Sequence, residues 1–416
     1  MIKKNIWIMN HYAHGTFFSK GGRHYWFAKY LLKNNYKPTI FCSNTRHNNR
    51  SIVEIKNGKH EIKTTDGIPY VFVKTTPYKR NGIQRIKNMW FFYRNLFPVT
   101  REYAKLHGKP DVILASSVHP LTLVAGIKIA KRFGVPCICE VRDLWPESLV
   151  AYKILKRDSI IAKILYKGEK WIYKKAGSII MTWEGGKQYI KDQRWDKQIR
   201  LEKIYHISNG VVVESFDKNS EENQISDPDL EDSGYKNIIY AGSIRKVNNL
   251  GLLLDAAKLI QESGYTRIRF LIYGSGNESD MLESRCAEEG IKNVIFKGRV
   301  EKKFIPYILK KAYVNILHNS STSLNKYGQS QNKLFEYLAA GRCIVQTYST
   351  GYSVCEKYNC GISVPVQNAE GIAEAIIQVC NDGKNNKIMG ENARQAAYEF
   401  DFEKLTNKLI DIIESL

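Results

Sequence analysis

Proline, long apolar runs and paired cysteine motifs are scarce or absent in this sequence. It has 11 prolines among 416 residues, with 25% charged and 12% aromatic residues, which excludes a collagen-like repeat and argues against disorder. No uninterrupted apolar run approaches the roughly 20 residues that cross a bilayer. Residues 1–10 hold too short an apolar stretch for a signal peptide. We therefore expect a globular protein that stays in the cytoplasm.

Motifs for metals and common cofactors are also missing. The eight cysteines show no C-x-x-C spacing, and no histidine is placed to complete a zinc site. The sequence lacks G-x-G-x-x-G and G-x-x-x-x-G-K-[ST], which counts against dinucleotide and P-loop binding. We expect reduced thiols packed in the core and no metal centre.

Acidic residues are few in the first half of the chain. Residues 1–200 hold 38 lysines and arginines against 13 acidic residues, whereas residues 201–416 hold 25 against 28. This asymmetry indicates that one half faces a polyanion, either a nucleic acid or an anionic membrane surface. A generally basic proteome is the alternative, but it does not explain the neutral second half.

The pattern of apolar residues predicts an α/β fold. Short β-branched runs alternate with helical patterns, which is typical of parallel α/β layers. In the first half we expect strands at 5–9, 38–43, 69–74, 111–116, 135–141, 178–182 and 203–206, and in the second half at 237–241, 268–273, 293–297, 314–318 and 343–347. The series restarts, so we predict two doubly wound units. The acidic stretch 214–232 between them is expected to be a solvated loop.

Ligands of doubly wound sheets bind where strands end and helices begin, so functional residues are expected in those loops. After the first predicted strand, Gly21 and Gly22 precede a helical pattern, which suits phosphate contact but is also a common structural turn. His119 stands at the end of the fourth strand, immediately before the proline of the next helix, where a helix-capping loop with an incidental imidazole is the alternative. The next strand leads into residues 140–148, which contain three carboxylates, Arg142 and Trp145.

The second half offers cations for a diphosphate. Gly242 and Ser243 follow a predicted strand, and Arg245 and Lys246 come directly after them. Farther on, a loop at 327–331 leads into a helix in which Lys333 and Glu336 fall on one face. A cation for phosphate and a carboxylate for ribose hydroxyls would then address the same nucleotide, although a surface ion pair is the plain alternative.

Together these residues resemble glycosyltransferase family 4, whose members are retaining enzymes of the GT-B fold that use nucleotide-activated sugars. The glycine loop at 21–22, the His119–Pro120 strand end, the turn at 208–211, the loop at 242–244 and the segment 330–341 occur in the order of that family. Residues 143–148, Asp-Leu-Trp-Pro-Glu-Ser, resemble the signature of a bacterial subgroup that builds O-antigen and capsular polysaccharide, including N-acetyl-fucosamine transferases.

The resemblance implies two Rossmann-like domains that face each other across a cleft. The N-terminal domain, 1–205, would face the acceptor and the membrane, and 206–398 would bind the nucleotide sugar. A helix over 399–416 would follow, with a return to the N-terminal domain left open.

The resemblance also implies roles for individual residues, in three groups. Arg245, Lys333, His119 and Asp143 would be catalytic. Donor-binding residues would be Gly21, Gly22, Gly242, Ser243, Lys246, Gly274, Arg299, Ser330, Gln331, Asn332 and Glu336. Arg142, Trp145 and Glu147 would bind the acceptor.

This sequence departs from the family pattern at two places. The family usually carries two glutamates in an E-x7-E spacing; here the second matches Glu336, but Gly328 stands at the first position. Backbone N–H groups of residues 330–332 are candidates to replace the first glutamate. The arginine of the G-R-L pattern falls on Ser243, so Arg245, Lys246 and Lys333 are the available phosphate-binding cations.

We therefore predict a retaining, metal-independent hexosyltransferase that moves a sugar, such as an N-acetylated or deoxy sugar, from a UDP-sugar to a lipid-linked saccharide on a polyprenyl diphosphate. No cofactor is expected, and no nucleic acid partner. One alternative is a nucleotide-sugar 2-epimerase of the same architecture. The other is a basic nucleic-acid-binding protein, for which no recognition module is present.

A basic, aromatic stretch at 74–109 predicts where a membrane would dock. Nine lysines and arginines stand there against Glu102 alone, and Trp90, Phe91, Phe92, Tyr93, Leu96 and Phe97 lie among them. Cationic rims around aromatic rings suit a peripheral segment at the inner face of the cell membrane. An ordinary helix that packs its aromatic side chains on the sheet is the alternative, because the four residues 90–93 do not share one helical face.

Overall fold

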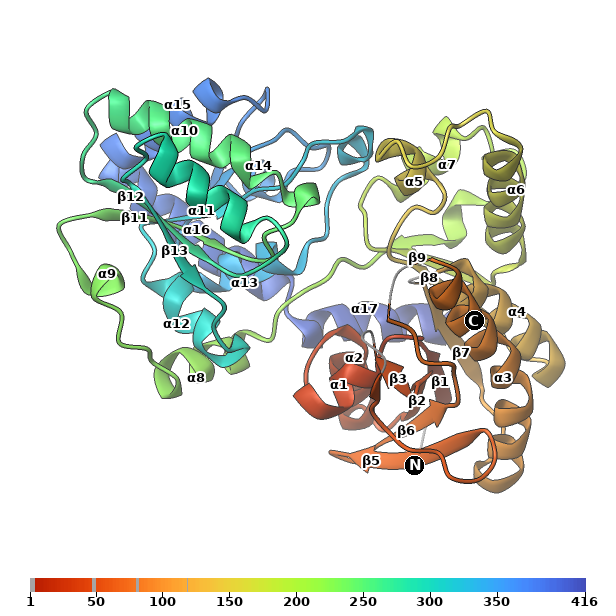
Figure 1. Cartoon of the computed structure of the whole chain (residues 1–416). Helices are drawn as coiled ribbons and strands as arrows, with labels where there is room; N and C mark the ends of the chain where they lie inside the picture. Colours follow the sequence, from red (N-terminus) through yellow and green to blue (C-terminus); the bar gives the residue numbers. More distant parts are fainter. Residues whose placement is uncertain (1–3, 47–49, 80–81, 118) are drawn as a thin grey trace. The chain divides into compact units, whose positions relative to one another are not determined.

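A computed structural model of the chain describes residues 4–46, 50–79, 82–117 and 119–416. The chain forms two compact units (Figure 1). The N-terminal unit comprises Met1–Ser208 and Phe402–Leu416, and the C-terminal unit comprises Asn209–Asp401. Each unit is built on one sheet of mostly parallel strands with helices packed against it, so the predicted pair of α/β units is confirmed.

The N-terminal unit has an eight-stranded sheet in the order β10-β9-β8-β7-β1-β2-β6-β5. All neighbouring strands pair in parallel except β5 and β6, which are antiparallel. The strands are β1 (Asn5–Met9), β2 (Lys37–Ser43), β5 (His60–Thr65), β6 (Ile68–Val73), β7 (Val112–Ser116), β8 (Cys137–Val141), β9 (Ser178–Met181) and β10 (Ile204–His206). A separate two-stranded ribbon is formed by β3 (Thr45–Arg46) and β4 (Arg50–Ser51).

Helices of the N-terminal unit pack in neighbouring pairs. They are α1 (His14–Ser19), α2 (Arg23–Lys33), α3 (Ile83–His107), α4 (Pro120–Phe133), α5 (Glu147–Ala151), α6 (Ile160–Lys175), α7 (Gly186–Asp192) and α17 (Phe402–Glu414). Figure 1 shows α3 beside α4, and α4 also contacts α6. The last helix, α17, packs on α2 through Phe402, whose ring meets the edge of Phe27 at 5.8 Å.

The C-terminal unit has a six-stranded parallel sheet in the order β13-β12-β11-β14-β15-β16. Its strands are β11 (Lys236–Ala241), β12 (Ile268–Tyr273), β13 (Val294–Gly298), β14 (Val314–Leu317), β15 (Cys343–Gln346) and β16 (Gly361–Ser363). Its helices are α8 (Val213–Glu222), α9 (Pro228–Glu231), α10 (Leu250–Glu262), α11 (Ser279–Glu288), α12 (Ile305–Lys310), α13 (Asn332–Ala340), α14 (Val354–Lys357), α15 (Ala369–Asn381) and α16 (Gly383–Glu399).

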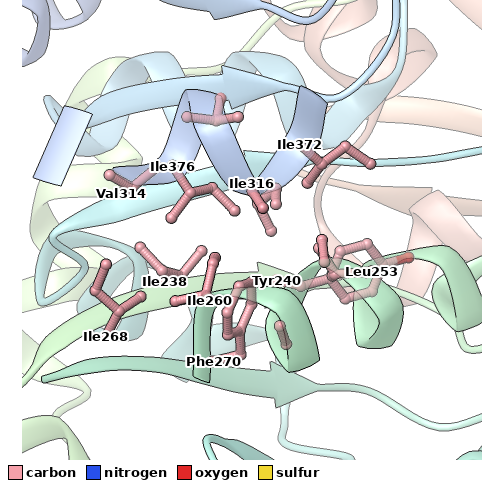
Figure 2. Packing of buried hydrophobic residues seen from close by; sticks show 14 of the residues in the cluster. Ile238, Tyr240, Leu253, Ile260, Ile268, Phe270, Val314, Ile316, Ile372 and Ile376 are labelled. Atoms are coloured by element: carbon pink, nitrogen blue, oxygen red, sulfur yellow. The ribbon is translucent and has the colours of Figure 1, made fainter. Parts of the chain in front are cut away.

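Alternating side chains of this sheet form two separate cores. Ile238 and Tyr240 of β11 point to the face covered by α10 and α15, as Figure 2 shows with Leu253 and Ile376 from those helices. Ile239, between them in the sequence, belongs to the opposite core with residues of α8, α12, α13 and α16. Both faces are buried, which explains why the strands read as continuous apolar runs.

Two predicted loops contain helices. Residues 214–232 were expected to be a solvated loop, but α8 and α9 lie there because Val213 and Phe216, three residues apart, bury one face of α8. The acidic side chains are paired as well: Asp217 forms ion pairs with Lys310 and Arg394. After the first strand, the helical pattern was expected to begin only beyond Gly22, but the short helix α1 already lies before the two glycines.

The aromatic stretch 90–97 lies within α3 and is partly a core element. Phe92 and Leu96 are buried, so these two side chains are not available to a membrane, contrary to expectation. Trp90 is half exposed. All eight cysteines are buried and unpaired. Within the described residues, no helix is long and apolar enough to cross a membrane.

Candidate active site in two strand-end clusters

In the C-terminal unit, a cleft of about 680 Å³ opens at the ends of β11, β12 and β13. Because β12 and β14 lie on opposite sides of β11, the loop after β11 stands at a topological switch point, where open α/β sheets bind ligands. Gly242, Ser243, Gly274 and Arg299, four of the predicted donor-binding residues, line this cleft. The structure thus brings together residues from three separate loops.

The glycines at the cleft allow two loops to touch. A Cβ atom at Gly274 would lie 1.7 Å from the carbonyl oxygen of Gly242, and the φ of Gly274 is +150°. No side chain fits this contact, so the loops after β11 and β12 meet backbone to backbone. The N–H groups of Gly242 and Gly274 donate to the carbonyl oxygens of Tyr273 at 2.9 Å and Gly298 at 2.8 Å, which fixes the backbone at this part of the cleft.

Tyr240 is the centre of the cation cluster beside this cleft. Its hydroxyl donates to the carbonyl oxygen of Ser243 at 3.0 Å. The Nζ atom of Lys333 lies 3.4 Å from the Tyr240 hydroxyl and 4.5 Å from the ring centroid. Burial raises the pKa of the Tyr240 phenol, and the charge of Arg245 partly offsets this shift, so Arg245 also acts on this group. Arg245 and Lys246 themselves are exposed.

Lys333 stands in the first turn of α13, where desolvation lowers its pKa to about 7. Its ammonium group donates to the carbonyl oxygen of His318 at 3.0 Å. His318 is buried and follows β14; its ring contacts Thr347 Oγ1 at 2.7 Å and the carbonyl oxygen of Asn249 at 2.9 Å. An amine that is easily neutralised and close to a cleft gains charge when an anion arrives.

Glu336 lies one turn farther along α13 and forms an ion pair with Lys302, a residue of the cleft lining, at 3.6 Å. Glu336 is half-buried, and its position relative to Lys333 agrees with the predicted shared face. The role of Glu336 at a ribose stays a prediction.

The loop before α13 is held by contacts within the unit. Ser330 accepts hydrogen bonds from both nitrogen atoms of Asn209, through Oγ at 2.7 Å and through its carbonyl oxygen at 2.6 Å. Gln331 donates to Asn319 at 2.6 Å, while its Oε1 atom is buried without a partner among the described residues. Asn332 is exposed and begins the helix. Gln331 Oε1 and the first N–H groups of α13 are therefore the groups left for a ligand.

In the N-terminal unit, two histidines meet at the switch point between β1 and β7. His11 Nδ1 and His119 Nε2 lie 2.7 Å apart, and both rings are buried. Burial lowers the pKa of His119 to about 3 and that of His11 well below its usual value, so both rings are neutral. His119 Nδ1 has no partner within the described part of the chain. Of the two histidines, His119 lines a small cavity together with Asp143 and Trp145.

A buried ionic network lies beneath the same strand ends. Glu140 is fully buried and accepts from Arg23 Nε at 2.7 Å and Ser116 Oγ at 2.6 Å, and it meets His24 at 2.9 Å. Burial alone would raise the pKa of Glu140, but Arg23 and His24 hold it well below its usual value. The Arg23 guanidinium also donates to the carbonyl oxygens of Ile207 and Ser208. It thereby fixes the chain where it leaves this unit.

Gly21 and Gly22 precede α2 directly, and Gly22 adopts a φ of +92°. The first side chain of that helix, Arg23, is committed to the buried network. Phosphate contact by the two glycines stays a prediction.

Residues after β8 border the small cavity. Asp143 is exposed, and Trp145 joins Pro146 through a cis peptide bond. The carbonyl oxygen of Arg142 accepts from Trp183 Nε1 at 3.0 Å. The Nε atom of the Arg142 side chain is buried and has no partner among the described residues. Glu169 also lines the cavity; burial raises its pKa to about 8, and Tyr173 donates to it at 2.8 Å.

Glu147, predicted to bind the acceptor, is occupied by neighbouring side chains. Arg157 Nη1 donates to both of its oxygens at 2.8 Å, Tyr166 donates at 2.7 Å and Gln193 at 3.1 Å. The carboxylate therefore joins α5 to α6 and to the end of α7. This arrangement explains why Glu147 is only 8% exposed.

No group of three metal-ligating side chains occurs in the described ranges. Asp227 and Asp229 have the D-x-D spacing of some metal sites, but Lys297 pairs with both, at 2.7 and 2.6 Å. Arg269 pairs with Asp229 at 3.0 Å. These carboxylates are therefore structural ion-pair partners in the C-terminal unit.

Family comparisons agree with this geometry. The model described as Glycosyltransferase Family 4 matches residues 25–215, and the model described as Glycosyl transferases group 1 matches residues 221–396. Each unit thus matches a glycosyltransferase model over most of its length. The chain has the GT-B fold, with the family 4 match in the N-terminal unit and the group 1 match in the C-terminal unit.

Individual relatives are distant in sequence. A probable glycosyltransferase, WbjE, from Pseudomonas aeruginosa is 22% identical over 206 residues, which are 47% of this chain and 48% of that protein. The chain thus matches about half the length of this curated relative.

Solved structures match over nearly their full length. A sucrose-phosphate synthase from Thermosynechococcus elongatus gives a TM-score of 0.72 at 16% identity, covering 99% of both chains. HepE from Anabaena, solved with UDP, gives a TM-score of 0.67 at 12% identity, covering 100% of both chains.

Sequence reasoning did not identify three residues of these clusters: His11, Tyr240 and His318. His318 follows a strand end just as His119 does, so the same rule would have found it. Tyr240 lies inside a strand, where an aromatic residue normally indicates core packing, and no local signal distinguishes it.

Proposed function

We propose that the chain is a retaining glycosyltransferase that moves a sugar from a UDP-sugar to a lipid-linked saccharide at the inner face of the cell membrane, for O-antigen or capsule synthesis. The observation that carries the donor part is the cleft lined by Gly242, Gly274 and Arg299 beside the Lys333 amine. It brings glycine backbone, which a ligand can approach closely, and cations together at one place, as a diphosphate requires. The similar fold of HepE, solved with UDP, supports a uridine nucleotide.

In the proposed reaction, the bond between the anomeric carbon and the β-phosphate oxygen breaks as a bond to the acceptor oxygen forms. The diphosphate leaves with the bonding electrons and takes the proton of the acceptor hydroxyl, so no metal or dedicated base is required. Arg245 and Lys333 stabilise the charge that develops on the leaving group. Arg299, Lys246 and the N–H groups before α13 hold the donor, and Glu336 binds the ribose.

The N-terminal unit contributes the acceptor side of the proposal. His119, whose Nδ1 atom has no partner among the described residues, and Asp143 border one cavity, where they position sugar hydroxyls. Trp145 and Arg142 complete an acceptor surface, which Glu147 supports by its contacts with α6 and α7. The excess of basic residues in this half supports an acceptor that carries a polyprenyl diphosphate.

A panel of nucleotide sugars tests the donor part. We expect slow release of UDP from at least one UDP-sugar without acceptor, and no release of ADP or GDP from the matching donors. If no UDP-sugar is hydrolysed, the donor assignment is wrong. Conversion of one UDP-sugar into its epimer would instead establish the isomerase alternative.

A further inference from the structure

Helix α6 has two apolar faces, and only one of them is covered. Ala162, Ile172 and Tyr173 are buried against the N-terminal unit. On the outer face, Ile160, Ile161 and Ile164 are 77%, 63% and 62% exposed. Three isoleucines exposed within about one turn form a patch that a monomeric protein rarely leaves to water.

The exposed stripe continues along the helix and into the segment before it. Trp171, seven residues after Ile164, lies on the same side because seven residues make about two turns. It is partly exposed. Before the helix, Ile154 is 72% exposed and Tyr152 is also exposed. We call this set, Tyr152, Ile154, Ile160, Ile161, Ile164 and Trp171, the α6 stripe.

Lysines surround the α6 stripe. Lys163, Lys167 and Lys174 recur along one side of the helix and are exposed, and Lys153 and Lys156 stand in the preceding segment. None of these five lysines forms an ion pair within the ranges that the structure describes. The surface is therefore apolar and cationic at once.

Acidic side chains do not neutralise this surface. Glu169 points inward, where Tyr173 and Tyr189 donate to it at 2.8 and 2.9 Å. Arg157 is paired with Glu147, and the exposed Asp158 is the one acidic residue of the segment 152–168. An occupant of this surface must therefore bring negative charge together with apolar material.

We propose that the α6 stripe docks the N-terminal unit on an anionic membrane surface. Exposed isoleucines enter the boundary between headgroups and acyl chains, and lysines beside them meet lipid phosphates. A protein partner is disfavoured because lysine is depleted in protein interfaces. The proposal rests on the proposed function, because a lipid-linked acceptor has to be reached at a membrane.

This assignment differs from the docking segment predicted at 74–109. In α3, Phe92 and Leu96 are buried, and Lys128 of α4 donates to the Tyr93 hydroxyl at 3.0 Å. Because α3 contacts α4 and α4 contacts α6, the basic residues of α3 lie in the same helical layer. They add long-range attraction, whereas α6 supplies the side chains that insert.

Vesicle sedimentation with the full chain tests the proposal. The variant Ile160→Ser/Ile161→Ser/Ile164→Ser removes apolar surface but no charge. With vesicles of phosphatidylglycerol and phosphatidylethanolamine in equal parts, we expect this variant to bind at least about tenfold more weakly than the wild type. The matched control Ile83→Ser/Ile86→Ser/Trp90→Ser removes three exposed side chains of α3 and should bind nearly as the wild type does.

Further measurements separate the possible failures. Unchanged Tm and UDP affinity in both variants show that folding and the donor site are intact. Equal vesicle binding of the α6 variant and the wild type overturns the proposal, as does a wild type that ignores anionic vesicles. If the wild type sediments as a dimer and the α6 variant as a monomer, the stripe is a subunit interface and the proposal is wrong. Absent UDP-sugar hydrolysis, with vesicle binding still dependent on the α6 stripe, would refute only the enzymatic function.

Discussion

Tyr240 lies among residues that the sequence indicated as donor-binding and residues that it did not indicate. The sequence singled out Lys333 as a phosphate-binding cation and Ser243 as a donor-binding residue, and the structure places both against the Tyr240 hydroxyl. The carbonyl oxygen of His318 holds the Lys333 amine from the other side. Lys333 is therefore oriented before any ligand arrives, which reduces the cost of ordering it on binding.

The lowered pKa of Lys333 predicts proton uptake when UDP binds. In the free protein desolvation lowers this pKa to about 7, and a neighbouring diphosphate favours the ammonium form. Below pH 7 the amine is already charged, so uptake should grow between about pH 6 and pH 8, approaching one proton. Calorimetry in buffers of different ionisation enthalpy measures this quantity. Lys333→Met should abolish it; uptake that persists in this variant would assign the proton to another group.

Glu336 offers a second test at the residue scale. Glu336→Ala should weaken UDP binding by about 1 to 3 kcal/mol, because ribose hydroxyls would lose a charged hydrogen-bond partner. Glu374→Ala, which removes an exposed carboxylate from α15 of the same unit, is the control for net charge and should leave affinity unchanged. UDP affinity that is the same in both variants would remove Glu336 from the nucleotide site.

Arg245 should act mainly on turnover. Its charge is needed most when the diphosphate departs, so Arg245→Ala should lower kcat by more than it raises the donor KM. Lys246, the adjacent exposed cation that we propose holds the donor, is the competing candidate: Lys246→Ala should raise the donor KM by more than it lowers kcat. A higher KM with unchanged kcat in Arg245→Ala would make Arg245 a ground-state binding residue.

Among the secondary-structure elements, the strands that are buried on both faces were predicted correctly. A helix whose charged residues hide the spacing of its apolar residues was missed. The central strands were predicted because buried parallel strands are continuous apolar runs. Helix α8 was missed because its acidic residues outnumber the spaced apolar pair Val213 and Phe216. Lys310 and Arg394, the ion-pair partners of Asp217, are distant in sequence. The contacts of Glu147 could not be predicted either, because Arg157 and Gln193 reach it only in the folded chain; its role at an acceptor stays a prediction.

The contact between the loops after β11 and β12 makes a prediction at this scale. Gly274→Ala places a methyl group 1.7 Å from the Gly242 carbonyl oxygen. We expect it to lower the free energy of unfolding by about 3 kcal/mol or more and to abolish UDP binding. Gly264→Ala is the control: its φ is also positive, at +82°, but no atom lies within 4 Å of the added methyl group. It should cost about 1 to 2 kcal/mol, measured by urea unfolding. Equal losses of unfolding free energy in the two variants would mean that backbone strain alone, and not the contact with Gly242, causes the destabilisation.

At the scale of the whole molecule, charge and chemistry are divided between the two units. The basic excess lies in the half that contains the α6 stripe and the cavity of His119 and Asp143. The nearly neutral half contains the cleft proposed for the donor. This division suits an enzyme that takes a soluble nucleotide sugar in one unit and a lipid-bound acceptor in the other.

Transfer of a radiolabelled sugar from the UDP-sugar that the panel identifies to a polyprenyl diphosphate saccharide tests this account most directly. The label should move from the aqueous nucleotide fraction into the organic-extractable lipid fraction, at a rate proportional to the amount of wild-type enzyme added. Arg245→Ala should slow this transfer. A label that stays entirely in the aqueous fraction, whether as the unchanged UDP-sugar or as its epimer, would contradict the account.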